Sequence, residues 1–175
     1  MRSLKFATAI ILGFAVSAAG AQTFNLSIVQ NEKAPAIAIE LSRVVEDEIL
    51  GQCFNAGLII SNDEIRFNGS DFPDKKFGIK QAAFGMSDYL LAVLLVYGKN
   101  EKKIEEKSLT YAELEKIQWR LVKVSDSSVI AEKTIKASSI PVQDSNPYNQ
   151  ARVIARSITS ETTELVINSG KKEKQ

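Results

Sequence analysis

The sequence of 175 residues contains no histidine and one cysteine, Cys53. The absence of histidine excludes Ser-His-Asp and Cys-His catalysis, the usual zinc sites and the commonest general base near neutral pH. One cysteine can form neither an intramolecular disulfide nor a thiolate metal cluster. Cys53 falls on the apolar face of an expected helix, which favours a small buried hydrophobe over a nucleophile. We therefore predict no metal and no other cofactor.

Glycine-rich catalytic and nucleotide-binding motifs are also missing. Neither G-x-G-x-x-G nor G-x-x-x-x-G-K-[ST] occurs, so no nucleotide-phosphate cradle can be recognised. The stretch Gly85-Met86-Ser87 matches the start of the nucleophile-elbow motif G-x-S-x-G, with Ser87 at the position of the nucleophile. Tyr89 occupies the position where the motif requires its second glycine. The S-x-x-K spacing at 169–172 lacks its companion motifs. These absences predict that the protein is not an enzyme and has no catalytic residues.

No apolar run reaches the roughly 20 residues that a membrane-spanning helix needs. The apolar stretch Phe6–Val16 follows Arg2 and Lys5 and precedes a series of small residues. This order is typical of a secretory signal peptide over residues 1–21, with cleavage between Ala21 and Gln22. Because glutamine and not cysteine follows the cleavage position, we expect no lipid anchor and no membrane insertion. The sequence therefore predicts an exported, soluble, periplasmic protein.

A strong charge imbalance is absent. The chain has 22 Lys and Arg against 21 Asp and Glu, and removal of Arg2 and Lys5 with the signal peptide leaves 20 against 21. A net charge of −1 argues against a nucleic-acid partner, because such proteins need an excess of cations to displace phosphate counterions. The acidic run Glu46-Asp47-Glu48 is expected to lie on a solvated helix face.

Apolar periodicity predicts a single α+β domain over residues 22–168, followed by a polar tail over 169–175. The expected elements are a half-buried strand over 24–29, a helix from about 35 to 56, a buried strand over 58–60, a short helix within 75–84, a central strand over 89–97, strands over 109–124 and 129–137, and a helix over 148–167. Residues 61–77 should be irregular and 98–107 a charged hairpin tip. The order β-α-β-(α)-β-β-β-α corresponds to one mixed sheet with helices packed on it.

Three stretches carry a resemblance to a known group of envelope domains: Leu41–Ile60, Ala82–Leu91 and Ile117–Ala131. They resemble the periplasmic domain shared by the penicillin-binding-protein activator LpoB, the curli secretion protein CsgG and the amino-terminal part of TolB. The resemblance extends over about residues 24–168 and implies a scaffold or binding role. This chain departs from the lipidated members at Gln22, and its loop at 98–107 is too short for the long hairpins of the channel proteins.

We therefore predict a non-catalytic binding or adaptor protein that docks on an envelope protein complex. The alternatives are a self-assembling ring or dimer, a His-independent hydrolase, and a small-molecule carrier. Aromatic residues on irregular segments are plausible binding anchors. The candidate partner-binding residues are Phe67, Phe72, Phe77, Trp119 and Arg120. For Trp119, apolar neighbours on the same strand face favour a core position.

Overall fold

The structure is a computed structural model that describes residues 22–141 and 146–172. The predicted signal peptide lies outside these residues. The elements are β1 (Thr23–Asn31), α1 (Ala38–Asn55), β2 (Ile59–Asn62), β3 (Arg66–Asn68), α2 (Ile79–Phe84), β4 (Tyr89–Ile104), β5 (Leu109–Lys123), β6 (Ser128–Lys136) and α3 (Pro147–Lys172), with 3₁₀ turns at Glu105–Lys107 and Ala137–Ser139. A six-stranded mixed sheet with three helices packed on it confirms the predicted α+β class.

The strands follow the order β2-β1-β4-β5-β6, and β3 pairs with β1 on the same edge as β2. β1 is parallel to β2, β3 and β4, whereas β4, β5 and β6 form an antiparallel meander. The first nine residues of β4 are all buried, since this strand is flanked by β1 and β5 and covered on both faces. The prediction of a central strand over 89–97 is therefore confirmed.

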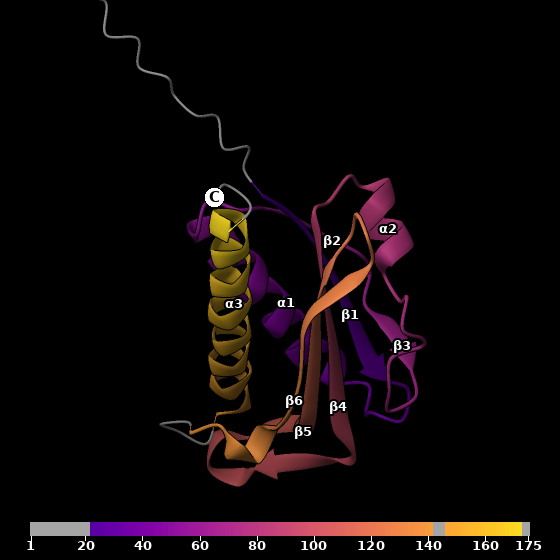
Figure 1. The fold of residues 1–175 in the computed structure, drawn as a ribbon. Helices are drawn as coiled ribbons and strands as arrows, with labels where there is room; N and C mark the ends of the chain where they lie inside the picture. The colour runs from indigo at the N-terminus through magenta and orange to yellow at the C-terminus, as the bar shows by residue number, and fades with distance from the viewer. Residues whose placement is uncertain (1–21, 142–145, 173–175) are drawn as a thin grey trace, which may run out of the picture.

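Helices α1 and α3 cover one face of the sheet, which we call the helix face (Figure 1). Ile117, Trp119 and Leu121 point from β5 into this core, as their alternation predicts. Gly57 ends α1 in a left-handed conformation with φ 76°. The Leu58 N–H then donates to the Cys53 carbonyl at 3.0 Å, which is the long hydrogen bond of a Schellman cap. This cap returns the chain directly into β2.

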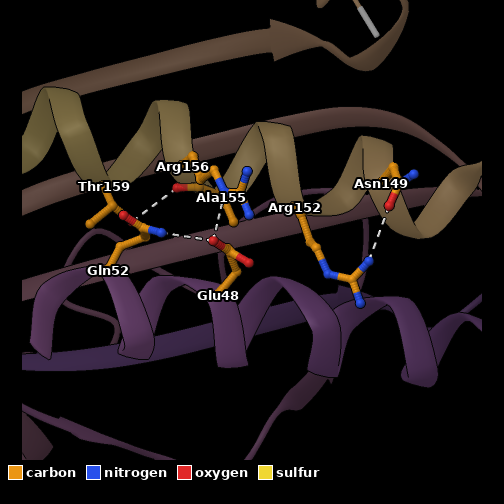
Figure 2. Close-up of polar contacts among 7 residues, drawn as sticks. All are labelled: Glu48, Gln52, Asn149, Arg152, Ala155, Arg156 and Thr159. Carbon is orange, nitrogen blue, oxygen red and sulfur yellow. Dashed lines mark hydrogen bonds and ion pairs between the residues drawn. The ribbon is translucent and has the colours of Figure 1, made fainter. Parts of the chain in front are cut away.

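A polar contact joins the two helices of the helix face (Figure 2). The Arg156 guanidinium donates to Glu48 Oε1 at 2.7 Å, and Gln52 Nε2 donates to the same oxygen at 2.9 Å. The Arg156 hydrogen bond lowers the pKa of Glu48 below its ordinary value. The Glu48 side chain is only 14% exposed, so the prediction of a wholly solvated acidic run is wrong for this residue. The reason is that α3 packs beside α1.

The opposite face, which we call the α2 face, carries a smaller core under α2 and the segment before it (Figure 1). Its buried members are Val29, Phe77, Ala82, Leu90, Ala92, Leu94, Val96 and Val122. Gly78 precedes α2 with φ 79°, and a Cβ added there would lie 3.0 Å from atoms of Leu90 and Ser27. Glycine is therefore required for α2 to lie this close to the sheet.

Several predicted details are wrong for reasons that involve neighbouring elements. β1 is buried on both faces instead of one, because α2 and its preceding segment cover the second face. β2 is a largely exposed edge strand instead of a buried one. β4 continues through the charged residues to Ile104, because backbone pairing with β5 extends to the Ile104–Leu109 pair and Ala112 of β5 is buried in the helix-face core. Residues 61–77 include β3, and α3 extends into the predicted tail. Among the described residues, no helix has the length and apolar character to cross a membrane.

Candidate functional site

Three of the five predicted partner-binding residues meet on the α2 face. The Phe72 and Phe77 rings have centroids 6.1 Å apart, and the guanidinium carbon of Arg120 lies 4.8 Å from the Phe72 centroid. Phe77 is buried and Phe72 is half-buried, so they anchor the segment before α2 onto the sheet. Tertiary folding thus joins residues of one irregular segment to a residue of β5.

Arg120 is an unusual member of this cluster because its side chain is buried. It is 4% exposed, and its Nη2 donates to the Asp74 carbonyl at 3.2 Å. Its Nε has no hydrogen-bond partner in the part of the chain that the structure describes. A buried guanidinium is costly to desolvate. Its closest contacts are the Asp74 carbonyl and the Phe72 ring, and Glu132 is its register partner on β6.

The other two predicted residues lie elsewhere. Trp119 is 1% exposed and belongs to the helix-face core, which confirms its predicted core position. Phe67 is 56% exposed on β3 and lines a groove of about 530 Å³ beside α1, together with Ile39 and Arg43. Contact between any of these five residues and a partner stays a prediction. Because Trp119 and Phe77 are buried, they can only support the surface and cannot touch a partner directly.

A basic hollow of about 550 Å³ opens beside Phe77, at the start of α2. Its lining residues are Arg66, Pro73, Asp74, Lys75, Lys76, Phe77, Gly78, Lys80 and Gln81. Four of these residues are cationic and one, Asp74, is a carboxylate. Sequence reasoning missed this feature because the overall charge is balanced, although three lysines within residues 75–80 are a local signal.

A second hollow of about 430 Å³, the polar cleft, lies between α2 and β2 and shares Lys80 and Gln81 with the basic hollow. Asn25 and Asp63 line the cleft, and the buried Ser27 side chain contacts both of them. Ser27 Oγ lies 2.5 Å from Asp63 Oδ2 and 3.1 Å from Asn25 Oδ1. Asn25 Nδ2 donates to Ser61 Oγ at 3.3 Å. Because Ser27 is 1% exposed, its hydroxyl orders the wall of the cleft and does not reach into it.

Large apolar side chains are exposed around the polar cleft, and we call Ile59, Phe84 and Met86 the apolar rim. Their exposed fractions are 58%, 92% and 85%. Phe84 lines the cleft with Ser61, which shares a face of β2 with Ile59. Ile59 is also the register partner of Thr23, whose Oγ1 contacts the Met86 carbonyl at 3.3 Å. The three side chains therefore surround one region at the β2 edge.

The apolar rim was not predicted from the sequence. Ile59 reads as part of a buried apolar run, and Phe84 and Met86 flank the glycine that ends a helix. Phe84 and Met86 both fall outside the apolar stripe of the short helix, and this position is the sequence signal of their exposure. A helix this short does not have two faces covered by other elements. Exposure of Ile59 depends on β2 lying at the edge of the sheet.

The β2 edge also presents main-chain groups. The N–H of Ile59 donates to the Gln22 carbonyl at 3.1 Å, and the N–H of Asp63 donates to the Leu26 carbonyl at 3.0 Å. Because main-chain direction alternates along a strand, the N–H groups of Ile60 and Asn62 face away from β1. Such an edge can accept a further extended segment.

Nucleophiles and metal ligands are placed unfavourably in the described residues. Cys53 lies on the buried face of α1, which confirms its predicted buried position, and burial raises the pKa of its thiol to about 11. Ser87 is buried at the end of α2. Across 22–141 and 146–172, no three Asp, Glu or Cys side chains are grouped so as to hold a metal ion.

The sequence matches a family model described as "Uncharacterised protein" over residues 23–166. No curated protein matches it. Among solved structures, the chain is similar to a PelC dodecamer from Paraburkholderia phytofirmans, with 14% identity over 80% of this chain and 87% of that chain and a TM-score of 0.48. It is also similar to lipoprotein GNA1162 from Neisseria meningitidis, with 8% identity over 84% of this chain and 99% of that chain and a TM-score of 0.42.

TolB from Acinetobacter baumannii is a further similar structure, with 9% identity over 83% of this chain and a TM-score of 0.40. The match covers 28% of TolB, so this chain corresponds to a minor part of that protein. TolB is one of the three proteins in the sequence resemblance, and the resemblance to LpoB and CsgG stays a prediction. Because these scores lie below 0.5, they assign no function to the chain.

Proposed function

The chain belongs to the family of uncharacterised proteins matched over residues 23–166, and we propose that it is an exported, non-catalytic adaptor that docks on an envelope protein complex through its apolar rim. The observation that carries this proposal is the exposure of Ile59, Phe84 and Met86 around one cleft. Burial of these side chains on binding would remove apolar surface from contact with water, which favours association, as at the centre of protein interfaces.

The surroundings of the apolar rim support a protein partner. The cleft at its centre offers amide, carboxylate and ammonium groups for hydrogen bonds, and the outward N–H groups of Ile60 and Asn62 offer main-chain pairing. A combination of apolar anchors with a small number of polar groups is usual for specific protein interfaces. The periplasmic location is inferred from the amino-terminal sequence pattern alone.

A photocrosslinking experiment tests the proposed docking. Phe84 is replaced by p-benzoylphenylalanine in the full chain, which is produced in the native cells and illuminated. We expect a covalent adduct with one envelope protein, because position 84 is 92% exposed and lines the cleft that the rim surrounds. The matched control places the same photoreactive residue at Ile167, which is 44% exposed on α3 in the opposite layer.

The outcomes of this experiment separate the candidate functions. An adduct from position 84 that is absent from position 167, and that is lost when Met86→Ser is added, supports the adaptor. Adducts of equal yield from both positions would indicate random encounters and contradict docking through the rim. An adduct with a second copy of the chain alone would replace the adaptor by self-assembly.

Self-assembly is the second candidate function, and the observation that favours it is the outer edge of β6, which pairs with no further strand in the part of the chain that the structure describes. This strand has nine residues at the end of the sheet opposite β2. Pairing of β6 of one copy with β2 of the next would be head-to-tail and could close a ring. Glu132, Lys133 and Lys136 lie along β6 and oppose such pairing unless the charges alternate across the contact. Light scattering that finds only monomer at millimolar concentration would exclude this function.

A further inference from the structure

The buried cation Arg120 lies behind the wall of the basic hollow. Its Nη2 donates to the main-chain oxygen of Asp74, and Asp74 itself lines the hollow. The charge of Arg120 is therefore separated from the hollow by one main-chain segment. Because the interior screens charge much less than water does, this guanidinium adds to the positive potential in the hollow.

The side chains at the mouth of the hollow have the same sign of charge. Arg66 comes from β3, Lys75 and Lys76 from the segment before α2, and Lys80 from α2. Asp74 is the one carboxylate among the lining residues, and its Oδ1 accepts the main-chain N–H of Lys76 at 2.5 Å. Four cations thus converge from three segments on a space that one carboxylate only partly compensates.

An aromatic contact gives one of these cations a fixed place. The guanidinium carbon of Arg66 lies 5.8 Å from the centroid of the Phe77 ring, and Phe77 in turn stacks against Phe72. A guanidinium held over an aromatic face keeps its edge N–H groups available for an oxyanion. The hollow therefore combines a positioned arginine with three lysines that act as mobile point charges.

We propose that the basic hollow is a binding site for a phosphate group that carries two negative charges. Phosphate fits better than a single carboxylate, since four surrounding cations and the buried Arg120 exceed what one negative charge compensates. The arginine supplies directional hydrogen bonds, and the lysines supply charge around the remaining oxygens. This site goes beyond the proposed docking function, because the apolar rim contributes nothing to it.

Two sources could supply this phosphate chemistry: a soluble phosphate compound or the phosphate headgroup of a lipid. The test for the first is an amide NMR titration of the mature chain with inorganic pyrophosphate against sodium chloride at equal ionic strength. The test for the second is co-flotation with vesicles of phosphatidic acid mixed into phosphatidylcholine, because the phosphomonoester headgroup of phosphatidic acid can carry two negative charges. For soluble phosphate, we expect saturable shifts at residue 66 and residues 74–80.

Matched variants separate a built site from general electrostatics. Lys75→Glu with Lys76→Glu should abolish saturable binding, whereas Lys99→Glu with Lys103→Glu changes the net charge equally on the exposed hairpin and should leave it intact. Arg120→Met should weaken binding by roughly fivefold, because it removes the positive charge behind the wall and the hydrogen bond to the Asp74 carbonyl but no group that lines the hollow. All four lysines are exposed, so each double variant should retain the fold.

Each outcome decides the proposal. Pyrophosphate binding that requires Lys75 and Lys76 supports the site and a soluble ligand. Vesicle binding with the same requirement supports the site and a lipid headgroup. The absence of both, or equal weakening in the hollow and hairpin variants, would overturn the proposal. Failure here leaves the photocrosslinking result at position 84 unaffected, so the two proposals fail separately.

Discussion

The two faces of the sheet are built differently, although they share strands. The helix face is closed by two long helices over a continuous apolar core, and Glu48 and Arg156 join those helices at its rim. The α2 face is closed by a six-residue helix and an irregular segment over a small core, and it contains two hollows, a buried cation and exposed apolar residues.

This difference is the basis of our proposal that partners bind the α2 face while the helix face mainly stabilises the fold. Most buried side chains on the helix face pack against apolar partners, so this face stabilises the fold, although Trp119 Nε1 has no hydrogen-bond partner among the described residues. The α2 face leaves polar and apolar groups without full compensation inside the chain. Buried polar groups without hydrogen-bond partners and exposed apolar side chains are common at functional sites, because a bound partner supplies the missing contacts.

Substitution of two adjacent leucines in β4 compares how rigidly the two faces are packed. Leu95 points to the helix face and Leu94 to the α2 face, and both are fully buried. We expect Leu95→Ala to lower the free energy of unfolding by about 3–5 kcal/mol and Leu94→Ala by about 2–3 kcal/mol, because the irregular segment can collapse into the cavity. Urea denaturation measures both. Equal losses would show that the α2 face is packed as rigidly as the helix face.

Arg120→Met tests whether the buried guanidinium stabilises the fold. We expect the free energy of unfolding to stay the same or rise by about 1–2 kcal/mol, because methionine fills similar space without the desolvation penalty of an ion. Thermal and urea denaturation give the change, and Arg156→Met on the helix face is the comparison. A loss of more than about 2 kcal/mol would mean that Asp74 and Phe72 compensate the charge fully.

The Glu48–Arg156 pair makes the helix face sensitive to acid. The pKa of Glu48 is lower in the folded chain than in the unfolded chain, so its stabilisation is present above the unfolded pKa and is lost as pH falls through the folded pKa. Arg156 is 58% exposed, so solvent screening weakens this contribution.

Glu48→Gln should therefore reduce the loss of stability as pH falls from above the unfolded pKa of Glu48 through its lower folded pKa, while leaving the curve at higher pH unchanged. Urea denaturation at a series of pH values measures this dependence. Glu46→Gln, on the same turn of α1 but without the Arg156 contact, is the control. A parallel shift of both variants would contradict a specific role for Glu48.

Phe84→Ser with Met86→Ser should have the smallest effect on stability. Both side chains are almost fully exposed, so we expect a change within about 0.5 kcal/mol in the free energy of unfolding. The same variant should lose the partner adduct described for the rim. Destabilisation by more than about 1 kcal/mol would show that the rim packs against the chain itself.

Much of the fold follows from local patterns. The apolar stripe through Leu41, Val45 and Ile49 produces α1, and the continuous apolar run from Tyr89 produces the buried first part of β4. Both predictions succeed because periodicity and length agree within one segment.

The candidate site follows from the sequence only in part. Phe72, Phe77 and Arg120 were predicted residue by residue, while their contact and the basic hollow were not. The reason is that these features depend on pairs distant in the chain, such as Arg120 with Asp74, which are 46 positions apart.

The sequence by itself determined the chemical limits of this protein and the order of its elements. Absent histidine, a lone Cys53 and missing glycine motifs need no coordinates to exclude the corresponding sites. The tertiary structure alone decided that β2 lies at an edge, that Arg120 is buried beneath Phe72, and that Ile59 joins Phe84 and Met86. The physical reason is that burial depends on what packs from outside a segment, and a local pattern does not contain its neighbours.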